Sequence, residues 1–468
     1  MDAIEHLIDF GLATRYEDVP AAVIARTRLA FLDTLGAMVA GIQGEGVQEL
    51  TELIGEWGGA PQATLITNGR RVPMHAAALV NGVAARAWDL DDVHEQNTCH
   101  VFASVIPALL AIAQARPVIS GKEALAAAAV AAETICRLSA APRASFSETG
   151  SSMTYQCAQY GVALMSARLF GLCKTGTRHA LGIAHARVSG NQQGFVAGAM
   201  TVRLMQGISA ESGVVSALMA EKGMTGSSEI LEGKFGYYPV YHRNRYERQD
   251  IVGGLGRIWR IPEISIKPAC PCCKYTHAPI DAAVQARNAL GEIELGDIAE
   301  IEVGVESREA HDLVCLPHDR KWNPATLTDA QFSLPFTVAH AIVHGKTDIA
   351  SFLPAGREDA EVRRLMPRIR IRPDFDVQGN SRGTFPMPGN VLIRLKDGSI
   401  ARGEVTYVKG HPRNPMGFED VAEKFRACAN LGLPGSRSVE RTIEAVARLD
   451  EQVDVSVLMN LCVDSAHS

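Results

Sequence analysis

The chain has 468 residues, of which 47% are hydrophobic and 21% charged, and its formal net charge is −6. This length predicts two or three domains, and the composition excludes a disordered protein. The 52 acidic and 46 basic residues are spread without long runs. Because the sequence lacks the basic patch of a nucleic-acid reader, we expect no nucleic-acid partner.

The cysteines and the apolar stretches both favour the cytoplasm. Ten cysteines in a chain of this length do not form the spacing of a disulfide scaffold, and reduced thiols suit that compartment. The most apolar stretch, residues 124–135, is short and contains Glu133, whereas a membrane span needs about 20 apolar residues. The N-terminus has no basic stretch followed by an apolar core. We therefore predict a cytoplasmic protein with no membrane partner.

Residues 1–262 are predicted to form the first part of a helical domain. Apolar and charged residues recur at helical spacing in segment after segment, and glycine follows several of these segments. Alanine is frequent, and such small residues let helices approach closely. The clearest helical segments are 76–88, 105–113, 123–138, 159–170 and 212–222.

Residues 263–409 are predicted to form an α+β domain. Charged and β-branched residues alternate in several segments, as in half-buried strands, and Asp397-Gly398 is a typical hairpin turn. The predicted strands are 298–305, 368–372, 390–395 and 400–408, and the predicted helices are 277–290 and 332–344. Helical spacing returns at 418–429 and 438–446, so residues 410–468 are predicted to rejoin the helical domain.

The densest polar cluster lies between two alanine-rich helices. Residues 88–95 read Trp-Asp-Leu-Asp-Asp-Val-His-Glu, and with His100 they place four carboxylates and two imidazoles within thirteen residues. Crowded carboxylates raise one another's pKa, and a nearby histidine can act as acid or base near neutral pH. A solvated loop with aspartate caps is the alternative. Trp88, Leu90 and Val93 favour partial burial instead.

A second cluster, residues 267–277, reads Lys-Pro-Ala-Cys-Pro-Cys-Cys-Lys-Tyr-Thr-His. Its cysteines lack both the CxxC spacing and the second distant pair of a structural zinc site, so the sequence predicts no metal. Lys267, Lys274 and His277 are suited to binding carboxylates. Ordinary surface lysines beside buried thiols are the alternative.

A third, weaker signal is the glycine-rich stretch 194–207. Its glycines permit close backbone approach, and Arg203 within it could hold a carboxylate with two hydrogen bonds. The stretch lacks the spacing of a phosphate-binding loop. The residues alone therefore indicate an enzyme with an Asp/His centre and cationic anion binders, without naming the reaction.

At these clusters, and along nearly the whole chain, the sequence resembles the MmgE/PrpD family, which includes 2-methylcitrate dehydratase, cis-aconitate decarboxylase and iminodisuccinate epimerase. The resemblance implies a mainly α fold: a large helical domain from both chain ends with an inserted α+β lid domain. It also implies a homodimer and an active site between the domains, with neither metal nor organic cofactor. The stretches that carry it are 32–36, 77–82 leading into 89–92, 267–277 with Asp281, 330–335, and 412–415 leading to 424–425.

By position, Asp89 matches the family's catalytic-site aspartate, His100 its loop histidine and Lys267 its lid lysine. The sequence also departs from the family pattern: Val101 follows His100 where the family usually has proline, and the lid segment is one residue longer, so either Lys267 or Lys274 could reach the site. Two further departures concern residues that could take part in the chemistry. Ser152 stands where dehydratases and decarboxylases of the family usually have histidine, and Val202 stands near the place of a common lysine.

The leading hypothesis is a cofactor-independent lyase, by preference a hydro-lyase similar to 2-methylcitrate dehydratase, acting on a small di- or tricarboxylate. Asp89 or His100 would move the proton α to a carboxylate, while cations hold the carboxylates. An epimerase of a dicarboxylate is one alternative, and a non-catalytic carboxylate-binding paralogue, favoured by Ser152 and Val202, is another. The catalytic candidates are Asp89, His100 and Lys267, and the substrate-binding candidates are Arg203, His277, Lys274, His94 and Asp92.

Overall fold

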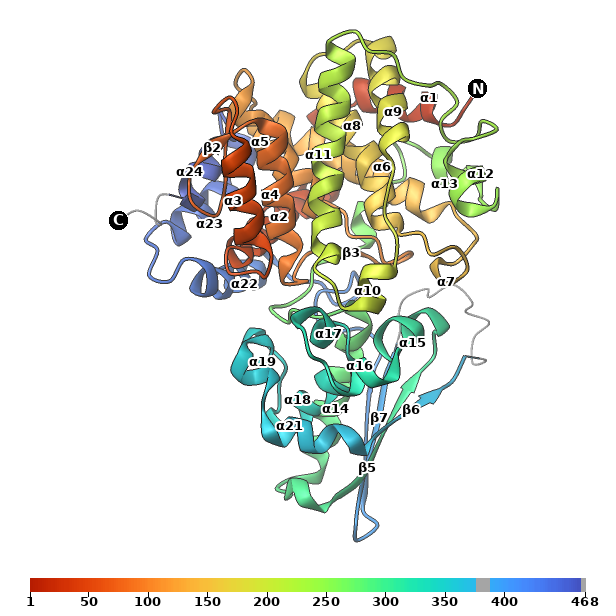
Figure 1. Cartoon of the computed structure of the whole chain (residues 1–468), viewed down its shortest axis with the longest axis vertical. Coiled ribbons are helices and arrows are strands. Elements are labelled where there is room, and N and C mark those ends of the chain that lie inside the picture. Colours follow the sequence, from red (N-terminus) through yellow and green to blue (C-terminus); the bar gives the residue numbers. More distant parts are fainter. Residues whose placement is uncertain (376–387, 464–468) are drawn as a thin grey trace.

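The computed structural model describes residues 1–375 and 388–463. Helices make up 59% of it and strands 9%, which confirms the predicted mainly α fold. Figure 1 shows a large helical body above a smaller part that carries the main sheet. Across the described ranges, no helix combines the length and the apolar character needed to cross a membrane.

Long helices packed side by side form the body. Glycines allow the closest crossings: a Cβ on Gly207 of α11 would lie 2.2 Å from the carbonyl oxygen of Leu79 in α4, and one on Gly41 of α2 would lie 2.0 Å from that of Ala84. The long body helices are α2 (Ala21–Gly41), α4 (Met74–Ala87), α5 (Phe102–Ala115), α6 (Gly121–Ala140), α8 (Met153–Leu169), α9 (Lys174–Arg187) and α11 (Thr201–Glu221).

The C-terminal helices also belong to the body. Helix α22 (Phe418–Gly432) packs against α2, and Lys424 of α22 forms a buried ion pair with Asp33 of α2 at 2.5 Å. Residues from both ends of the chain thus pack together, and α23 (Val439–Ala447) and α24 (Val457–Val463) complete this side.

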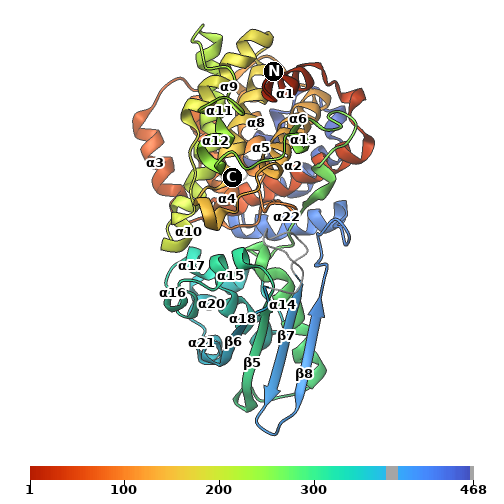
Figure 2. The same ribbon diagram turned by 90° about the vertical axis from the view of Figure 1, so that its right-hand side faces the viewer.

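The sheet region, defined here as residues 274–375 and 388–405, contains a four-stranded sheet in the order β6-β5-β7-β8. Its strands are β5 (Ile298–Val305), β6 (Ile369–Pro373), β7 (Gly389–Leu395) and β8 (Ile400–Val405). Strands β5 and β6 are parallel, whereas β7 is antiparallel to both β5 and β8. Helix α14 (Lys274–Leu290) packs against β7, β8 and α18 (Leu334–His344), and Figure 2 shows these elements together below the body.

Within the described residues, the chain crosses between the two parts twice, and the crossings lie side by side. Strand β4 (Ile264–Ser265) pairs with β3 (Val93–His94) from the acidic loop. One residue later, the backbone N–H of Ile266 donates to the carbonyl of Gly410 at 3.2 Å. The first crossing is therefore bound both to the predicted catalytic loop and to the returning chain. The domain boundaries at 262 and 409 stay a prediction.

Shorter elements fill the remaining chain. Two of them, α7 (Phe146–Thr149) in the body and α15 (Arg308–Val314) in the sheet region, meet at the border between the two parts. The others are α1 (Ile4–Ala13), α3 (Val47–Trp57), β1 (Ala63–Thr64), β2 (Arg71–Val72), α10 (Gln193–Ala197), α12 (Tyr237–His242), α13 (Arg248–Val252), α16 (His318–Trp322), α17 (Leu327–Gln331), α19 (Ile349–Phe352), α20 (Pro354–Arg357) and α21 (Ala360–Leu365).

Candidate active site

A narrow cleft lies between the acidic loop of the body and the start of α14 in the sheet region. Its polar wall carries Asp89 and His100 from the body and Lys274 from the sheet region. Its apolar wall includes Phe146 and Phe332. The full lining consists of Arg86, Asp89, Val93, Asn97, Thr98, His100, Phe146, Ser152, Met153, Thr154, Gln192 and Phe195 from the body, Cys273 from the segment before α14, and Lys274, Tyr275, Leu313 and Phe332 from the sheet region.

The end of α4 places Asp89 on the cleft wall. The helix ends at Ala87, and Asp89 then adopts a left-handed backbone with φ 51°, a conformation that aspartate tolerates better than most non-glycine residues. Arg86 lies three residues earlier, one helical turn away, and pairs with the carboxylate of Asp89. Its guanidinium also lies 3.2 Å from Asp91 Oδ1. One arginine thus holds two carboxylates of the loop.

Asp91 orients the imidazole of His100. His100 Nδ1 lies 2.9 Å from Asp91 Oδ2, and its backbone N–H donates to Thr154 Oγ1 at 3.2 Å. With the proton on Nδ1, Nε2 is left to act as a base toward a bound molecule. Burial, aided by Arg86, lowers the pKa of His100 to about 4. The imidazole is therefore neutral near pH 7 and can accept a proton.

The carboxylate of Asp91 stays ionised although it is fully buried. Burial acts to raise its pKa, but the charges of Arg86 and His100 outweigh this effect and hold the pKa below its usual value. A charged Asp91 favours a positive charge on the neighbouring imidazole. It can therefore stabilise His100 after the histidine has taken a proton.

Lys267 lies behind Asp89 and is 1% exposed. Its Nζ is 3.4 Å from Asp89 Oδ2 and also donates to the carbonyl of Asp89 and, at 3.5 Å, to that of Cys272. Burial lowers the pKa of Lys267 to about 8, against the opposing effect of Asp91. Lys267 thus holds Asp89 in place from the sheet-region side.

Lys274 is the predicted lysine that lines the cleft. Its Nζ lies 3.3 Å from Glu95 Oε1, the last carboxylate of the acidic loop, and Ser265 donates to the same oxygen. Burial lowers the pKa of Lys274, and Glu95 opposes that effect. The structure therefore brings four predicted residues together: Asp89, His100, Lys267 and Lys274.

Asp92 and His94 point away from the cleft. Asp92 accepts the backbone N–H groups of Val101 and Phe102 at 3.2 and 2.9 Å, so it caps the N-terminus of α5. Burial and the charge of Asp91 raise the pKa of Asp92 to about 8. His94 is fully buried, with Nε2 3.2 Å from Glu263. The predicted substrate contact requires a side chain that lines the cleft, and neither residue lines it.

Arg203 and His277 also lie outside the cleft lining. Arg203 donates to the carbonyl of Glu45 at 3.1 Å and to Thr328 Oγ1 at 2.8 Å, so it bridges the body and α17. His277 follows Lys274 by three residues on α14, and its ring lines a different hollow. The predicted carboxylate contacts of both residues are replaced by contacts within the protein.

The two departures at positions 152 and 202 have different surroundings. Ser152 lines the cleft, whereas Val202 is buried and its carbonyl accepts the hydroxyl of Tyr155 at 2.7 Å. His185, a conceivable substitute for a histidine at position 152, instead contacts Tyr160 and Phe235. It does not line the cleft.

Asp89, Asp91 and His100 also have the spacing of a cation site, because one ligand atom from each lies within 4.8 Å of the others. Positively charged side chains of the protein already pair with these carboxylates. Arg86 contacts both aspartates and Lys267 contacts Asp89. A divalent ion would be repelled by both side chains, so the donor set fits an anion-binding centre better than a metal centre.

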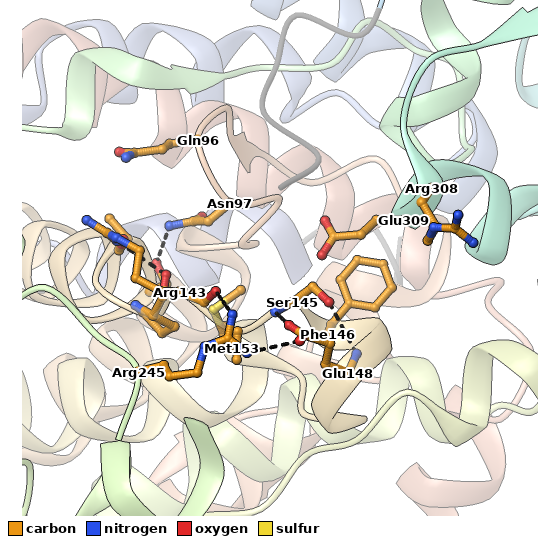
Figure 3. A pocket seen from close by; sticks show the side chains of 14 residues that line it. Gln96, Asn97, Arg143, Ser145, Phe146, Glu148, Met153, Arg245, Arg308 and Glu309 are labelled. Carbon is orange, nitrogen blue, oxygen red and sulfur yellow. Dashed lines mark hydrogen bonds and ion pairs between the residues drawn. The ribbon is translucent and has the colours of Figure 1, made fainter. Parts of the chain in front are cut away.

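A larger hollow of about 1040 Å³, here called the vestibule, adjoins the cleft and shares Asn97, Phe146 and Met153 with it. Figure 3 shows its labelled side chains, among them three arginines. Arg143 pairs with Asp250 and Arg245 pairs with Glu148 at 3.0 Å. The third arginine is Arg308 of α15.

Glu309 and Phe146 meet where the vestibule joins the cleft (Figure 3). The carboxylate of Glu309 accepts the backbone N–H of Phe146, and burial raises its pKa to about 7. Nearby, Ser147 Oγ donates to Asp312 Oδ2 at 3.0 Å. Helix α7 of the body and helix α15 of the sheet region are therefore joined by hydrogen bonds next to the cleft.

Sequence reasoning missed Arg86 and Phe146. Arg86 has a recognisable signal, since an arginine three residues before an aspartate lies on the same helix face. Phe146 has none, because its place on the cleft depends on how α7 contacts the sheet region.

Comparisons with known proteins match the chain over most of its length. Residues 5–249 match the model of the MmgE/PrpD N-terminal domain, and residues 270–451 match that of the MmgE/PrpD C-terminal domain. Cis-aconitate decarboxylase of Aspergillus terreus is 26% identical over 476 aligned positions, which cover 96% of this chain and 93% of that protein. Cis-aconitate decarboxylase of Homo sapiens is 25% identical over 455 positions, covering 94% and 90%.

Proposed function

The chain belongs to the MmgE/PrpD family, and we propose that it is a cofactor-independent lyase of a small di- or tricarboxylate. The observation that carries the proposal is the meeting of His100 and Lys274 at one cleft, with Asp91 behind the imidazole at 2.9 Å. A proton acceptor and an ammonium group thus face the same space from the two parts of the molecule. The similarity to proteins named cis-aconitate decarboxylase, which covers nearly the whole of both chains, supports the same reaction class, because decarboxylases are lyases.

In the proposed reaction, His100 Nε2 removes the proton from the carbon next to a substrate carboxylate. Arg86 and Lys274 bind carboxylates, because both line the cleft and carry positive charge. Negative charge then develops on the substrate oxygens as the C–H bond breaks. Cationic donors aimed at such charge typically contribute a few kcal/mol each.

Dehydration is the preferred outcome of this step. The electron pair of the broken C–H bond forms a C=C bond while the adjacent C–O bond breaks, and a proton from Lys274 converts the leaving hydroxide to water. This reaction needs an acceptor and a donor of protons at once, and His100 and Lys274 meet both needs. More specifically, we propose a hydro-lyase that resembles 2-methylcitrate dehydratase.

Decarboxylation is the second candidate, favoured by the similarity to cis-aconitate decarboxylases. In that reaction the C–C bond to one carboxylate breaks and carbon dioxide leaves. The electron pair stays on the substrate carbon, and the resulting carbanion takes a proton. The apolar side chains on the cleft wall, such as Phe146, Leu313 and Phe332, suit the departure of a neutral molecule. Lys274 or protonated His100 would then supply the proton.

The test is incubation of the full chain with a panel of acids in deuterated water, followed by proton NMR. The panel contains methylcitrate, citrate, cis-aconitate and iminodisuccinate. An unsaturated product from a hydroxy acid indicates a hydro-lyase, loss of carbon dioxide indicates a decarboxylase, and deuterium in the recovered stereoisomers indicates an epimerase. Binding of these acids without turnover of any of them would contradict the proposal. It would instead support the hypothesis of a non-catalytic paralogue.

His100→Gln is the variant that tests the site. We expect it to lower kcat about 10²–10⁴-fold, the usual contribution of a general base. His185→Gln is a matched control, because His185 lies outside the cleft lining. Turnover of His100→Gln within a few-fold of the wild type would remove His100 from the mechanism.

The resemblance also leads us to propose a homodimer in the cytoplasm. Light scattering of the eluted full chain would then give twice the 50.2 kDa of one subunit. A mass of one subunit at working concentrations would contradict the dimer.

A further inference from the structure

We propose that Cys270, Cys272 and His277 form a binding site for a soft divalent metal ion, with Zn²⁺ as the best match, outside the active site. The three residues belong to the segment that leads from the first crossing into α14. One ligand atom from each lies within 4.8 Å of the others. All three side chains are buried, at 7%, 0% and 4% exposure.

The two sulfur atoms have the separation that a metal requires. Cys270 Sγ and Cys272 Sγ are 3.4 Å apart, and both residues are free cysteines. Two thiolates at about 2.3 Å from a tetrahedral zinc ion lie roughly 3.8 Å from each other. A shift of a few tenths of an ångström would therefore admit the ion, whereas a disulfide needs the sulfur atoms at about 2.05 Å.

His277 supplies the third ligand, in an arrangement that is common around metals. Its Nε2 lies 3.2 Å from the carbonyl oxygen of Cys272. With the proton on Nε2, the ring donates to this carbonyl and Nδ1 is unprotonated. Metal-binding histidines usually donate their second ring N–H to a carbonyl or carboxylate in this way.

Thr276 adds a further outer contact. Its hydroxyl donates to Cys272 Sγ at 3.1 Å and lies 2.8 Å from the carbonyl of Cys273. A donor to sulfur stabilises a thiolate, which is the form that binds metal.

The cluster borders a solvent-connected hollow that provides an entry path and room for a fourth ligand. This hollow, of about 1260 Å³, is lined by Cys270, His277 and Asp281 among others. Asp281 follows His277 by one helical turn on α14. On binding, the two thiols release their protons to solvent, and two thiolates balance the charge of the ion while water fills the open position.

The proposal reverses the expectation drawn from the sequence, which predicted no metal because the cysteine spacing matches no zinc knuckle. The cysteine spacing was a poor guide because the third ligand is a histidine of the adjacent helix and not a second pair of cysteines further along the chain. The start of α14 turns His277 back onto the Cys-Pro-Cys segment.

The site would fix the segment that carries two active-site lysines. Lys267 Nζ donates to the carbonyl of Cys272 at 3.5 Å, and Lys274 begins α14 directly after Cys273. We therefore assign the metal a structural role. Zinc should raise the thermal stability of the protein, because a ligand that binds the native state stabilises it.

Titration of the full, reduced, metal-depleted chain with Co²⁺ tests the proposal. We expect one equivalent to bind and to give the near-ultraviolet absorption of cobalt bound to thiolates. Cys270→Ser and Cys272→Ser should abolish this band and the zinc-dependent rise in Tm, and His277→Gln should weaken both. Cys173→Ser is the control, because Cys173 is an exposed free thiol directly before α9, and it should keep both signals.

A second measurement needs no variant. The wild type is alkylated with and without Zn²⁺, and the protected cysteines are identified by mass spectrometry. Protection of Cys270 and Cys272 supports the site. Absence of a thiolate band in folded wild type, protection of other cysteines instead, or a band that survives in both serine variants would overturn it. So would a Cys270–Cys272 disulfide in the isolated chain together with no metal uptake after reduction.

Discussion

The chemistry of His100 depends on which ring nitrogen carries the proton, and Asp91 decides this. The carboxylate lies 2.9 Å from Nδ1, so it favours the tautomer that leaves Nε2 as the base. Asp91 need not touch the substrate, since it is fully buried and does not line the cleft. It is a positioning residue.

Asp91→Asn should therefore lower kcat by about 10²-fold or more while changing KM less, because the amide can hold the wrong tautomer. The pH profile should also change, since the charge that stabilises protonated His100 is lost. Steady-state kinetics from pH 5 to 9 measure both effects. Asp92→Asn is the matched control: this neighbour caps α5, so we expect a lower Tm rather than the same kinetic change. Equal kinetic losses in the two variants would contradict the role of Asp91.

Lys267 should set the alkaline limb of the activity profile. Its pKa is lowered to about 8 by burial, so the ammonium loses its proton as the pH rises through that value. Deprotonation removes the positive charge next to Asp89, and we expect kcat/KM to fall above about pH 8. In Lys267→Arg the charge persists at higher pH. If Lys267→Arg is active, its kcat/KM should not fall in the same way at alkaline pH. An identical fall would mean that another group sets the alkaline limb of the profile.

The sequence identified part of this site and not the rest. Asp89, His100, Lys267 and Lys274 were found because their residue types cluster within two short segments. Arg203 lies in a glycine-rich stretch and His277 lies close to cysteines, and both surroundings suggested a binding site. Their side chains instead bond to Thr328 and to the Cys272 carbonyl, respectively. Those partners are selected by the packing of α17 and α14, which no local pattern encodes.

At the level of elements, the contact between α7 and α15 limits the apolar side of the cleft. Phe146 lies on the cleft and on the vestibule at once. The hydrogen bonds of Glu309 and Asp312 keep this short helix in place. We therefore expect the side chain of Phe146 to limit the length of the proposed acid substrate.

Phe146→Ala should relax this selectivity. We expect kcat/KM for an acid with a longer apolar branch to rise about 10-fold relative to the preferred substrate, since filling or vacating such space is worth about 1–3 kcal/mol. Competition between acids of increasing branch length measures the ratio. Phe235→Ala is the control, because Phe235 is 72% exposed on the body. An unchanged ratio in Phe146→Ala would remove Phe146 from the specificity of the cleft.

Helix α11 shows where element prediction fails. The sequence predicted a helix from 212, whereas α11 begins at Thr201. No helix was predicted over the glycine-rich stretch, but Gly207 lies inside α11 and allows its close crossing with α4 at Leu79. The strand 298–305 was predicted with its observed bounds, because one buried face gives a clear alternation.

For the molecule as a whole, Arg203 connects the two parts. It is 2% exposed, and it donates to Glu45 in the body and to Thr328 in α17. Burial lowers its pKa to about 10, which still leaves it charged at neutral pH. Such a buried, charged donor contributes to stability through both of its bonds.

Arg203→Gln should therefore reduce the free energy of unfolding by about 1–3 kcal/mol and leave KM nearly unchanged. Urea denaturation and steady-state kinetics measure the two quantities. Arg187→Gln is a control within the body, where Arg187 pairs with Glu211 on the surface, and it should cost less. A large rise in KM without loss of stability would restore the carboxylate-binding role that the sequence predicted for Arg203.

The paired crossings between body and sheet region also determine how the cleft can open. The bond from Ile266 to Gly410 keeps the two connecting segments together, so any rotation of the sheet region turns about an axis through them. Displacement in a rotation grows with distance from the axis, and Lys267 is adjacent to it. If the sheet region rotates in this way, we expect Lys267 to keep its contact with Asp89 while Leu313 moves with the outer wall, so that the charged end of the cleft stays assembled.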